Sequence, residues 1–271
     1  MWMINSLIAF LVTIAALYIF ALHGRIGHAK LKDLRGWSYA HRGLHDATSP
    51  ENSMSAFSKA VEAGYGIELD VHLMKDGNLA VIHDSSLKRT AGVDKKIEDL
   101  TGEDLLNYRL EGTEESIPLF TDVLQMVDGK TPLIVEIKVE TNNFKAVTEA
   151  TCKVLENYHG TYCVESFDPR VVAYVRKHYP QFVRGQLAHN SLSESSPVPK
   201  FLRFLLTYDL LNFLVVPDFI AYRYQDRKTL SNFLCRKLWR VQGVSWTITD
   251  EKQYHTAKKE GWVPIFENFK P

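Results

Sequence analysis

Cysteine is scarce in this chain of 271 residues, and motifs that would pair its thiols are missing. The three cysteines, Cys152, Cys163 and Cys235, are widely spaced and form no C-x-x-C pair. An odd number of isolated thiols fits reduced cysteines in a reducing compartment better than a disulfide framework. Since none of them lies beside a histidine-rich strand end, we do not expect a thiol nucleophile.

The chain also lacks an excess of charge of either sign. Its 32 basic residues balance 32 acidic ones, and no lysine and arginine block is interleaved with aromatic residues. The composition therefore gives no indication of nucleic-acid binding. Hydrophobic residues make up 45% of the chain, so it can bury a full core, and its length suits one large α/β domain or two small ones.

A long apolar run is present at the N-terminus. Residues 4–22 contain no charge, and as a helix they would span about 28 Å, close to the hydrocarbon thickness of a bilayer. A signal peptide is the alternative, but no basic residue precedes Ile4, and Ala21-Leu22-His23-Gly24 is a poor cleavage site. We therefore expect an uncleaved, single-pass membrane anchor.

Basic residues on the far side of this run predict its orientation. They are Arg25, Lys30, Lys32 and Arg35. Because positive residues flank the cytoplasmic side of membrane helices, we expect the N-terminus outside and the rest of the chain in the cytoplasm. This divides the chain into an anchor with a basic juxtamembrane segment (1–35) and a folded domain (36–271).

Short β-rich runs alternate with amphipathic helical stretches after Trp37. The expected strands are 37–40, 66–73, 79–83, 132–139, 161–166, 183–187, 218–222 and 244–247. Capping and stop signals place helices at 52–63, 143–158, 168–178 and 250–260. Eight strands alternating with helices predict a (β/α)8 barrel. A doubly wound open sheet is the alternative, weakened because no G-x-G-x-x-G follows the first strand.

Two segments interrupt the alternation. Residues 85–117 are polar and loop-rich, with one short helical stretch after Thr101. Residues 201–216, FLRFLLTYDLLNFLVV, are more apolar than a barrel helix needs to be. They predict a helix buried between the barrel and its neighbours. The alternative is a helix that faces the membrane or gates the substrate beside the anchor.

Polar residues interrupt the apolar runs in the first half of the chain. The groups are His41-Arg42-Gly43, Glu68-Leu69-Asp70, His83-Asp84 and Glu136-Ile137-Lys138. Burying an unpaired charge is costly, so a core strand has no structural use for such residues. Residues i and i+2 of a strand face the same way, about 6.6 Å apart. Glu68 and Asp70 therefore share a face, which His72 continues, and Glu136 and Lys138 repeat the arrangement on another strand.

Carboxylates that converge at the mouth of a barrel repel one another unless a divalent cation holds them. All-oxygen ligation favours Mg²⁺ or Ca²⁺ over zinc. That leaves His41 and His83 as candidates for acid and base. Arg42 offers a fork for phosphate oxygens, and Gly43 allows a close backbone approach.

Each of these residues also has a structural interpretation. His83 by itself is compatible with a hydrogen-bonded structural histidine, and Lys138 with an ion pair to Glu136 alone. Trp246, at the end of the last expected strand, is compatible with a core aromatic. The pattern as a whole, rather than any single residue, indicates a metal-assisted phosphate site.

The order of the motifs closely resembles that of the glycerophosphodiester phosphodiesterase family. The matching segments are HRG at 41–43, PENS at 50–53, IELDV at 67–71, KDG at 75–77, HD at 83–84, LKRT at 87–90, IP at 117–118, EIK at 136–138, SF at 166–167 and WT at 246–247. Ser53, Met74, Glu165 and Thr249 depart from the family pattern. None of these departures removes a presumed ligand.

The resemblance implies a TIM-like barrel that uses a divalent cation to cleave a glycerophosphodiester to glycerol 3-phosphate and an alcohol. It implies that the metal is bound by Glu68, Asp70 and Glu136, and that the phosphate is bound by Arg42 and Lys138. It also implies that acid–base catalysis is carried out by His41 and His83 and that the glycerol moiety lies against Trp246. It further implies attack by the glycerol 2-hydroxyl and a cyclic phosphate. A phospholipase C- or D-like or lysophospholipase D activity on membrane lipids is the alternative. A catalytically silent head-group binder is a third hypothesis.

Overall fold

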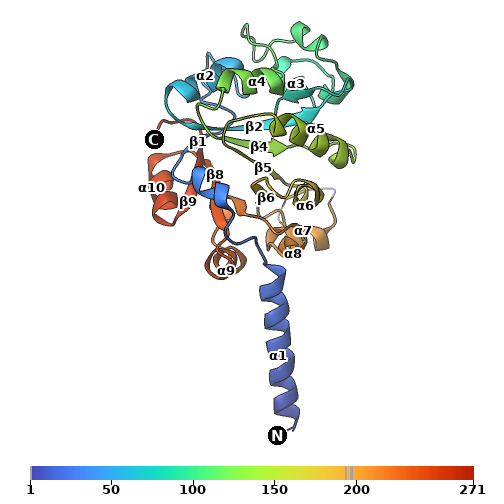
Figure 1. Ribbon diagram of the computed structural model, residues 1–271, viewed down its shortest axis with the longest axis vertical. Helices are drawn as coiled ribbons and strands as arrows, with labels where there is room; N and C mark the ends of the chain where they lie inside the picture. The colour runs from blue at the N-terminus through green and yellow to red at the C-terminus, as the bar shows by residue number, and fades with distance from the viewer. Residues whose placement is uncertain (1, 193, 196–197) are drawn as a thin grey trace.

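Eight parallel strands close into a barrel (Figure 1), because β9 pairs with β1 and β1 pairs with β2. The computed structural model describes residues 2–192, 194–195 and 198–271. The barrel strands are β1 (Tyr39–Ala40), β2 (Gly66–Leu73), β4 (Leu133–Ile137), β5 (Tyr162–Ser166), β6 (Arg184–Ala188), β7 (Phe219–Arg223), β8 (Gln242–Ile248) and β9 (Trp262–Phe266). The predicted (β/α)8 barrel is confirmed.

The membership of the barrel differs from the prediction in two strands. The expected strand 79–83 forms β3 (Leu79–Val81), which pairs antiparallel with the outer end of β2 and lies outside the barrel. The eighth barrel strand is β9, which the strand prediction missed. Its sequence contains Pro264, and proline argues against a central strand because it has no N–H to donate. Trp246 accordingly lies in the seventh barrel strand rather than the last.

Helices cover the outside of the barrel. They are α2 (Met54–Glu62), α4 (Phe120–Val127), α5 (Phe144–Glu156), α6 (Pro169–His178), α9 (Leu230–Leu238) and α10 (Glu251–Lys259), with α7 and α8 described below. The side chain of Ser53 caps α2 by accepting from the Ala56 N–H at 3.2 Å. Asp168 caps α6 by accepting from the Arg170 N–H at 2.9 Å. The four expected helices are confirmed as α2, α5, α6 and α10.

The polar segment 85–117 has its own small core. It holds α3 (Lys88–Ala91) and two 3-10 turns, Ile97–Asp99 and Asp104–Asn107, of which the second is the short helix expected after Thr101. Buried apolar residues from this segment pack with residues of β3 and its neighbours: Leu87, Ile97, Leu100, Leu105, Leu110 and Ile117 with Met74, Ala80 and Ile82. The segment thereby braces the loop that carries His83.

The apolar segment 201–216 is not one buried helix, so that prediction is wrong. It forms α7 (Lys200–Thr207) and α8 (Asn212–Val215), separated by a turn. Asp209 lies in this turn with a φ of 58°, which ends the helical path. Several of its large side chains reach solvent, and Phe201 is 73% exposed.

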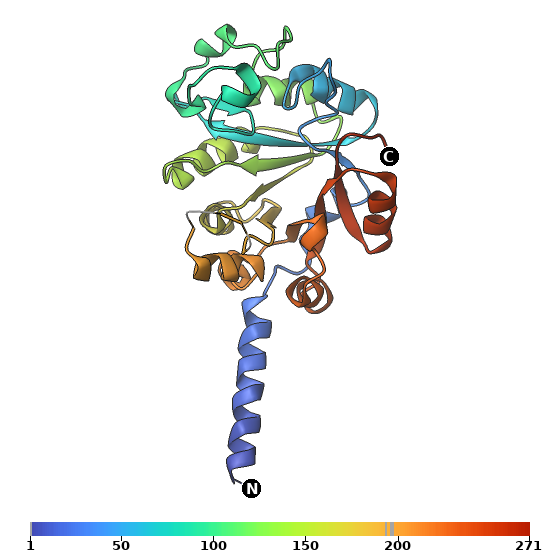
Figure 2. The same ribbon diagram turned by 180° about the vertical axis from the view of Figure 1, so that it is seen from behind.

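The N-terminal helix α1 (Trp2–Ala21) projects away from the barrel, as Figures 1 and 2 show from opposite sides. None of its side chains is buried, and it is long and apolar enough to cross a membrane. The chain then returns to the barrel. Leu31 and Leu34 are buried with Tyr39 and Phe219 at the N-terminal end of the barrel, which they close. The domain boundary at residue 35 stays a prediction.

Candidate active site

The carboxyl ends of three neighbouring strands bring acidic side chains to one level of the barrel. The parallel register pairs Asp70 with Glu136, and Glu136 with Glu165. Glu68 lies two residues before Asp70 on the same face of β2. One carboxylate oxygen each of Glu68, Asp70 and Glu136 lies within 4.8 Å of the others, and all three residues are buried.

This cluster has more negative charge than its surroundings balance. Burial, with repulsion from Asp70 and Glu136, raises the pKa of Glu68 well above its ordinary value. Burial also raises the pKa of Glu136 to about 7, against the attraction of Lys138. A buried group of hard oxygen ligands in need of positive charge fits a divalent cation such as Mg²⁺ or Ca²⁺.

Lys138 supplies part of the missing positive charge. Its Nζ lies 2.9 Å from Asp70 Oδ1 and 2.7 Å from Glu136 Oε1. Although burial disfavours its charge, these two carboxylates raise the pKa of Lys138, so the ammonium stays charged. Burial likewise opposes the charge of Asp70, but Lys138 and nearby cations hold its pKa well below the usual range. Lys138 therefore joins two strands rather than pairing with Glu136 alone.

Arg42 reaches the acidic cluster from the loop after β1. Its backbone N–H donates to Glu68 Oε2 at 3.0 Å, and its Nη1 donates to Glu51 Oε1 at 2.9 Å. Its φ is 55°, and the next residue, Gly43, has a φ of 83°. A Cβ at Gly43 would lie 2.9 Å from the backbone of Ala56, so this turn requires glycine.

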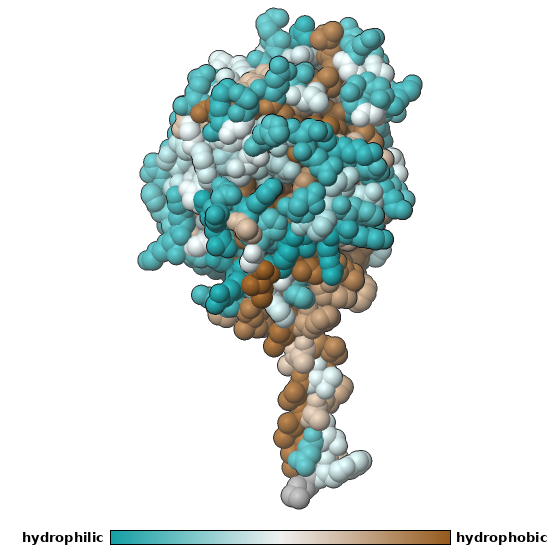
Figure 3. All heavy atoms as spheres, in the orientation of Figure 1, coloured by the Kyte–Doolittle hydropathy of each residue, from teal (hydrophilic) through white to brown (hydrophobic). Residues whose placement is uncertain are grey.

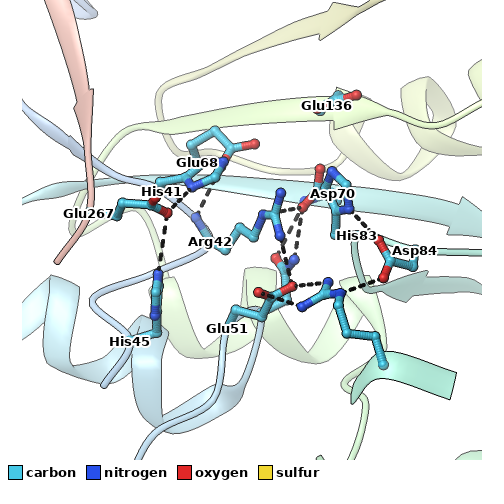
Figure 4. Close-up of polar contacts among 12 residues, drawn as sticks. His41, Arg42, His45, Glu51, Glu68, Asp70, His83, Asp84, Glu136 and Glu267 are labelled. Carbon is cyan, nitrogen blue, oxygen red and sulfur yellow. Dashed lines mark hydrogen bonds and ion pairs between the residues drawn. The ribbon is translucent and has the colours of Figure 1, made fainter. Parts of the chain in front are cut away.

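His41 lies beside this loop with a carboxylate behind it (Figure 4). Its Nδ1 bonds Glu267 Oε2 at 2.7 Å, while its Nε2 lies 3.9 Å from Glu68 Oε2. The bond to Glu267 assigns the proton to Nδ1 and leaves Nε2 free toward the cluster. Burial lowers the pKa of His41, although the hydrogen bond to Glu267 opposes this.

His83 is held in a similar way on the opposite side of the cluster (Figure 4). Its Nδ1 bonds Asp84 Oδ1 at 2.6 Å. Arg89 in turn donates to Asp84 Oδ2 at 2.6 Å and to both oxygens of Glu51. Burial also lowers the pKa of His83, despite the attraction of Asp70. Each histidine is thus oriented by a carboxylate bonded to its Nδ1, which leaves Nε2 as the atom for proton transfer.

His72 supports this arrangement without entering it. It continues the row of Glu68 and Asp70 along β2, as expected, but its Nδ1 bonds Glu98 Oε1 at 2.7 Å. Its Nε2 lies 3.1 Å from the carbonyl oxygen of His83. The side chain therefore positions the backbone of the loop that carries His83.

A cavity of about 410 Å³ joins the two histidines and the acidic cluster. Phe167, Leu187 and Trp246 form an apolar wall on one side of it. The indole N–H of Trp246 donates to the Ala221 carbonyl at 3.0 Å, and its ring contacts Phe167 edge-on at 5.6 Å between centroids. The structure thus brings all the expected site residues together, including Trp246.

A wider groove of about 970 Å³ continues from the cluster toward α7. It begins at His83, Glu136 and Lys138 and ends between apolar side chains of α7, Leu202 and Leu206. A polar reaction site therefore opens directly into an apolar groove.

Four acidic residues of this site received no role from the sequence. Glu51 and Asp84 belong to recognised motifs, but only the fold shows that Arg89 links them. Glu267 follows β9, the strand that was missed. Glu165 was noted as a departure, yet it lies in the row of carboxylates, and its Oε2 has no hydrogen-bond partner among the described residues. Glu165 comes directly after an apolar run, and this position was the signal by which the sequence could have identified it.

Known proteins resemble this chain in sequence and in fold. The model of the glycerophosphoryl diester phosphodiesterase family matches residues 41–269. A glycerophosphodiester phosphodiesterase of Bacillus altitudinis is 38% identical over 114 residues, 40% of this chain and 46% of that protein. Lysophospholipase D GDPD1 of Rattus norvegicus is 36% identical over 116 residues, 38% of this chain and 36% of that protein. The matches thus span about half the length of these curated relatives or less.

A solved structure shows the same fold. It is that of an Oleispira antarctica phosphodiesterase in complex with the product sn-glycerol-3-phosphate. It has a TM-score of 0.73 and 19% identity, and the match covers 87% of this chain and 94% of that chain. At this identity the likeness concerns the barrel alone.

Proposed function

Since the chain belongs to the glycerophosphoryl diester phosphodiesterase family, we propose that it is a phosphoric diester hydrolase that cleaves glycerophosphodiesters to glycerol 3-phosphate and an alcohol. The observation that carries the proposal is the pair of carboxylate-backed histidines on either side of one acidic cluster. His41, His83, Glu68 and Glu136 all line one cavity, which supports a role for the histidines in proton transfer and for the carboxylates in binding a cation.

The proposed cofactor is a divalent cation, Mg²⁺ or Ca²⁺, held by Glu68, Asp70 and Glu136. Their buried oxygens within 4.8 Å of one another and the raised pKa of Glu136 support this ligand set. When bound, the cation would neutralise the phosphoryl oxygens and lower the pKa of an adjacent hydroxyl. Arg42 and Lys138 would bind the same phosphoryl group from its other sides.

In the proposed first step, the glycerol 2-hydroxyl attacks phosphorus. One histidine, neutral at the start, accepts its proton at Nε2. The other starts as an imidazolium and donates its Nε2 proton to the departing alcohol oxygen, giving a cyclic phosphate. Glu267 and Asp84 bond Nδ1 of the two rings, so that Nε2 of each ring is the atom that exchanges the proton. Trp246 would lie against the glycerol moiety.

In the proposed second step, water opens the cyclic phosphate with the two histidines in exchanged roles. The histidine that gave up its proton now accepts one from water, and the other returns its proton to the glycerol 2-oxygen. The product is glycerol 3-phosphate, and both residues regain their starting protonation states.

We also propose that α1 anchors the enzyme in a membrane as a single-pass helix, with residues 36–271 as the catalytic domain in the cytoplasm. Its exposed, apolar length supports membrane insertion. The basic residues that follow it support the orientation.

The apolar groove favours a second candidate substrate, a lysophospholipid cleaved in lysophospholipase D fashion. Its acyl chain would lie between Leu202 and Leu206 while its phosphate occupies the acidic cluster. A relative named lysophospholipase D supports this alternative.

A substrate panel tests both candidates on the full-length protein in detergent. Soluble glycerophosphodiesters and lysophospholipids are compared with Mg²⁺, with Ca²⁺ and with EDTA. We expect metal-dependent release of glycerol 3-phosphate that His41→Ala and His83→Ala both abolish, with unchanged circular dichroism. Full activity in either variant, or in excess EDTA, would contradict the mechanism.

A bulky residue in the groove separates the two substrates. Leu202→Trp should slow lysophospholipid turnover and leave glycerophosphocholine turnover unchanged, because only the acyl chain needs the groove. Leu106→Trp, at an exposed leucine outside the groove, is the matched control. Equal effects on both substrates would argue against an acyl site there.

A further inference from the structure

Apolar side chains gather on the outside of the barrel around the end of α1. Ten large apolar residues outside α1 are exposed among those that the structure describes, and seven of them belong to α7, α8 and α9. Scattered exposed leucines are ordinary, but a contiguous group marks a contact surface. We call these seven side chains the flank surface: Phe201, Leu202, Phe204, Leu214, Leu230, Phe233 and Leu238.

Helix α9 contributes an outward apolar stripe. Leu230, Phe233 and Leu238 are 64%, 57% and 50% exposed, while Ser231, Asn232 and Cys235 of the same helix are buried. A helix on the surface of a soluble barrel would carry polar residues on this outer face. Here both faces lack acidic residues, and the outer one is largely apolar.

The flank surface is continuous with α1. The indole N–H of Trp239 donates to the Ile19 carbonyl at 2.9 Å, and the Trp239 ring stacks on His23 at 4.5 Å between centroids. On the other side, Phe20 contacts Phe213 of α8 at 5.8 Å between centroids. Figures 1 and 2 agree that α7 and α8 lie on one side of the end of α1 and α9 on the other. In Figure 3 the apolar atoms of α1 run on into the base of the barrel.

Charge on these elements has a single sign. The segment from Arg227 to Arg240 contains five basic residues and no acidic residue. Arg227 is buried against Glu260, whereas Lys228, Lys237 and Arg240 are exposed. These exposed cations complement anionic phospholipid head groups. Continuity with α1 and this exposed basic charge favour a lipid surface over a protein as the occupant.

We propose that the flank surface is a second membrane contact, in which the side chains of α7, α8 and α9 enter the head-group boundary of an anionic bilayer. The barrel then rests with its side on the membrane instead of hanging free on α1. The inference rests on the proposed anchoring by α1 but is not implied by it, since a tethered barrel needs no further contact.

Site-directed fluorescence on the full-length protein tests this contact. Phe233→Cys and Phe204→Cys are labelled with an environment-sensitive dye and reconstituted in vesicles whose lipids carry nitroxide quenchers on the acyl chains. The native cysteines are buried, so labelling is confined to the introduced thiol. Leu11→Cys reports insertion of α1, and Leu106→Cys is the exposed control on the 3-10 turn Asp104–Asn107.

We expect quenching to remove at least half of the emission at positions 233 and 204 in vesicles with phosphatidylglycerol, with weaker quenching in pure phosphatidylcholine. Position 106 should remain unquenched. Quenching at 233 and 204 no greater than at 106 would overturn the proposal.

Position 11 separates this result from the anchor itself. Quenching at 11 without quenching at 233 or 204 leaves α1 as an anchor and refutes the flank contact. Quenching at none of the three refutes both. If the dye at position 233 is shielded at high protein density but not at one copy per vesicle, the flank surface contacts a second copy of the chain. That result would also overturn the proposal.

Discussion

Replacing Glu136 by glutamine should stabilise the metal-free protein while it removes a proposed metal ligand. Glu136 is buried, and its pKa is raised to about 7 because burial and Asp70 outweigh Lys138. The folded protein therefore holds a proton on Glu136 more tightly than the unfolded chain does. As the pH rises from about 4.5 through 7, the folded state must give up this proton, and stability is lost.

The size of the effect follows from the shift. A rise from an ordinary pKa of 4.5 to about 7 corresponds to about 3 kcal/mol, at about 1.4 kcal/mol per unit. Glutamine keeps the shape of the protonated side chain but cannot ionise. Glu136→Gln should therefore be more stable than the parent by about 3 kcal/mol at pH 8, with a difference near zero at pH 4.5.

Urea unfolding of the full-length protein in detergent, followed by circular dichroism in EDTA at both pH values, measures this difference. Glu149→Gln, at an exposed position on α5, is the control and should change stability little. Added Mg²⁺ or Ca²⁺ should stabilise the parent at pH 8 and Glu136→Gln much less, because one ligand is gone. A Glu136→Gln protein that is less stable than the parent at pH 8, or equal metal stabilisation of both, would refute the charge-cluster reasoning.

Three further predictions concern the histidines. With saturating metal, the acidic limb of kcat/KM should lie below the ordinary histidine pKa of about 6.5, because burial lowers the pKa of both His41 and His83 and the histidine that acts as base must be neutral. Activity on this limb is lost as the pH falls through the lowered pKa of that histidine, and a limb above 6.5 in a pH–rate profile would contradict this. Glu267→Gln should lower kcat about a hundredfold and move the acidic limb to lower pH, because the carboxylate that favours protonated His41 is removed. An acidic limb at the same pH would argue against the pairing of His41 with Glu267. Arg89→Ala should lower kcat at least about tenfold, because Asp84 behind His83 loses the side chain that holds it. The free energy of unfolding should be nearly unchanged, because the Arg89 side chain is 46% exposed. An unchanged kcat would show that Asp84 holds His83 without Arg89.

The barrel and the centre of the site could be predicted because alternation and polar interruption are local signals. The i, i+2 spacing of Glu68 and Asp70 is enough to put both side chains on one face of a strand. The cross-strand partners could not be found this way. Glu267 bonds His41 across most of the length of the chain, and it follows a strand that its own proline disguised. The link from Arg89 to Glu51 likewise depends on how two loops fold together.

The prediction of one buried helix at 201–216 was wrong for a different reason. Its composition correctly indicated an unusual apolar element, but composition does not say whether an apolar face meets protein or another medium. Asp209, a single residue in the left-handed region, decided that there would be two short helices rather than one. Turn formation of this kind is settled by local backbone geometry and tertiary contacts rather than by hydrophobic periodicity.

The closure of the barrel by Leu31 and Leu34 makes the stretch after α1 a structural part of the enzyme. Arg25 reinforces the joint, donating to Asp218 Oδ1 at 2.6 Å and to the carbonyls of Pro180 and Phe182. A protease that cut the chain near residue 35 would therefore remove Leu31 and Leu34, which close the barrel, together with α1. A soluble form that keeps its fold has to be cut before Leu22, which is itself fully buried.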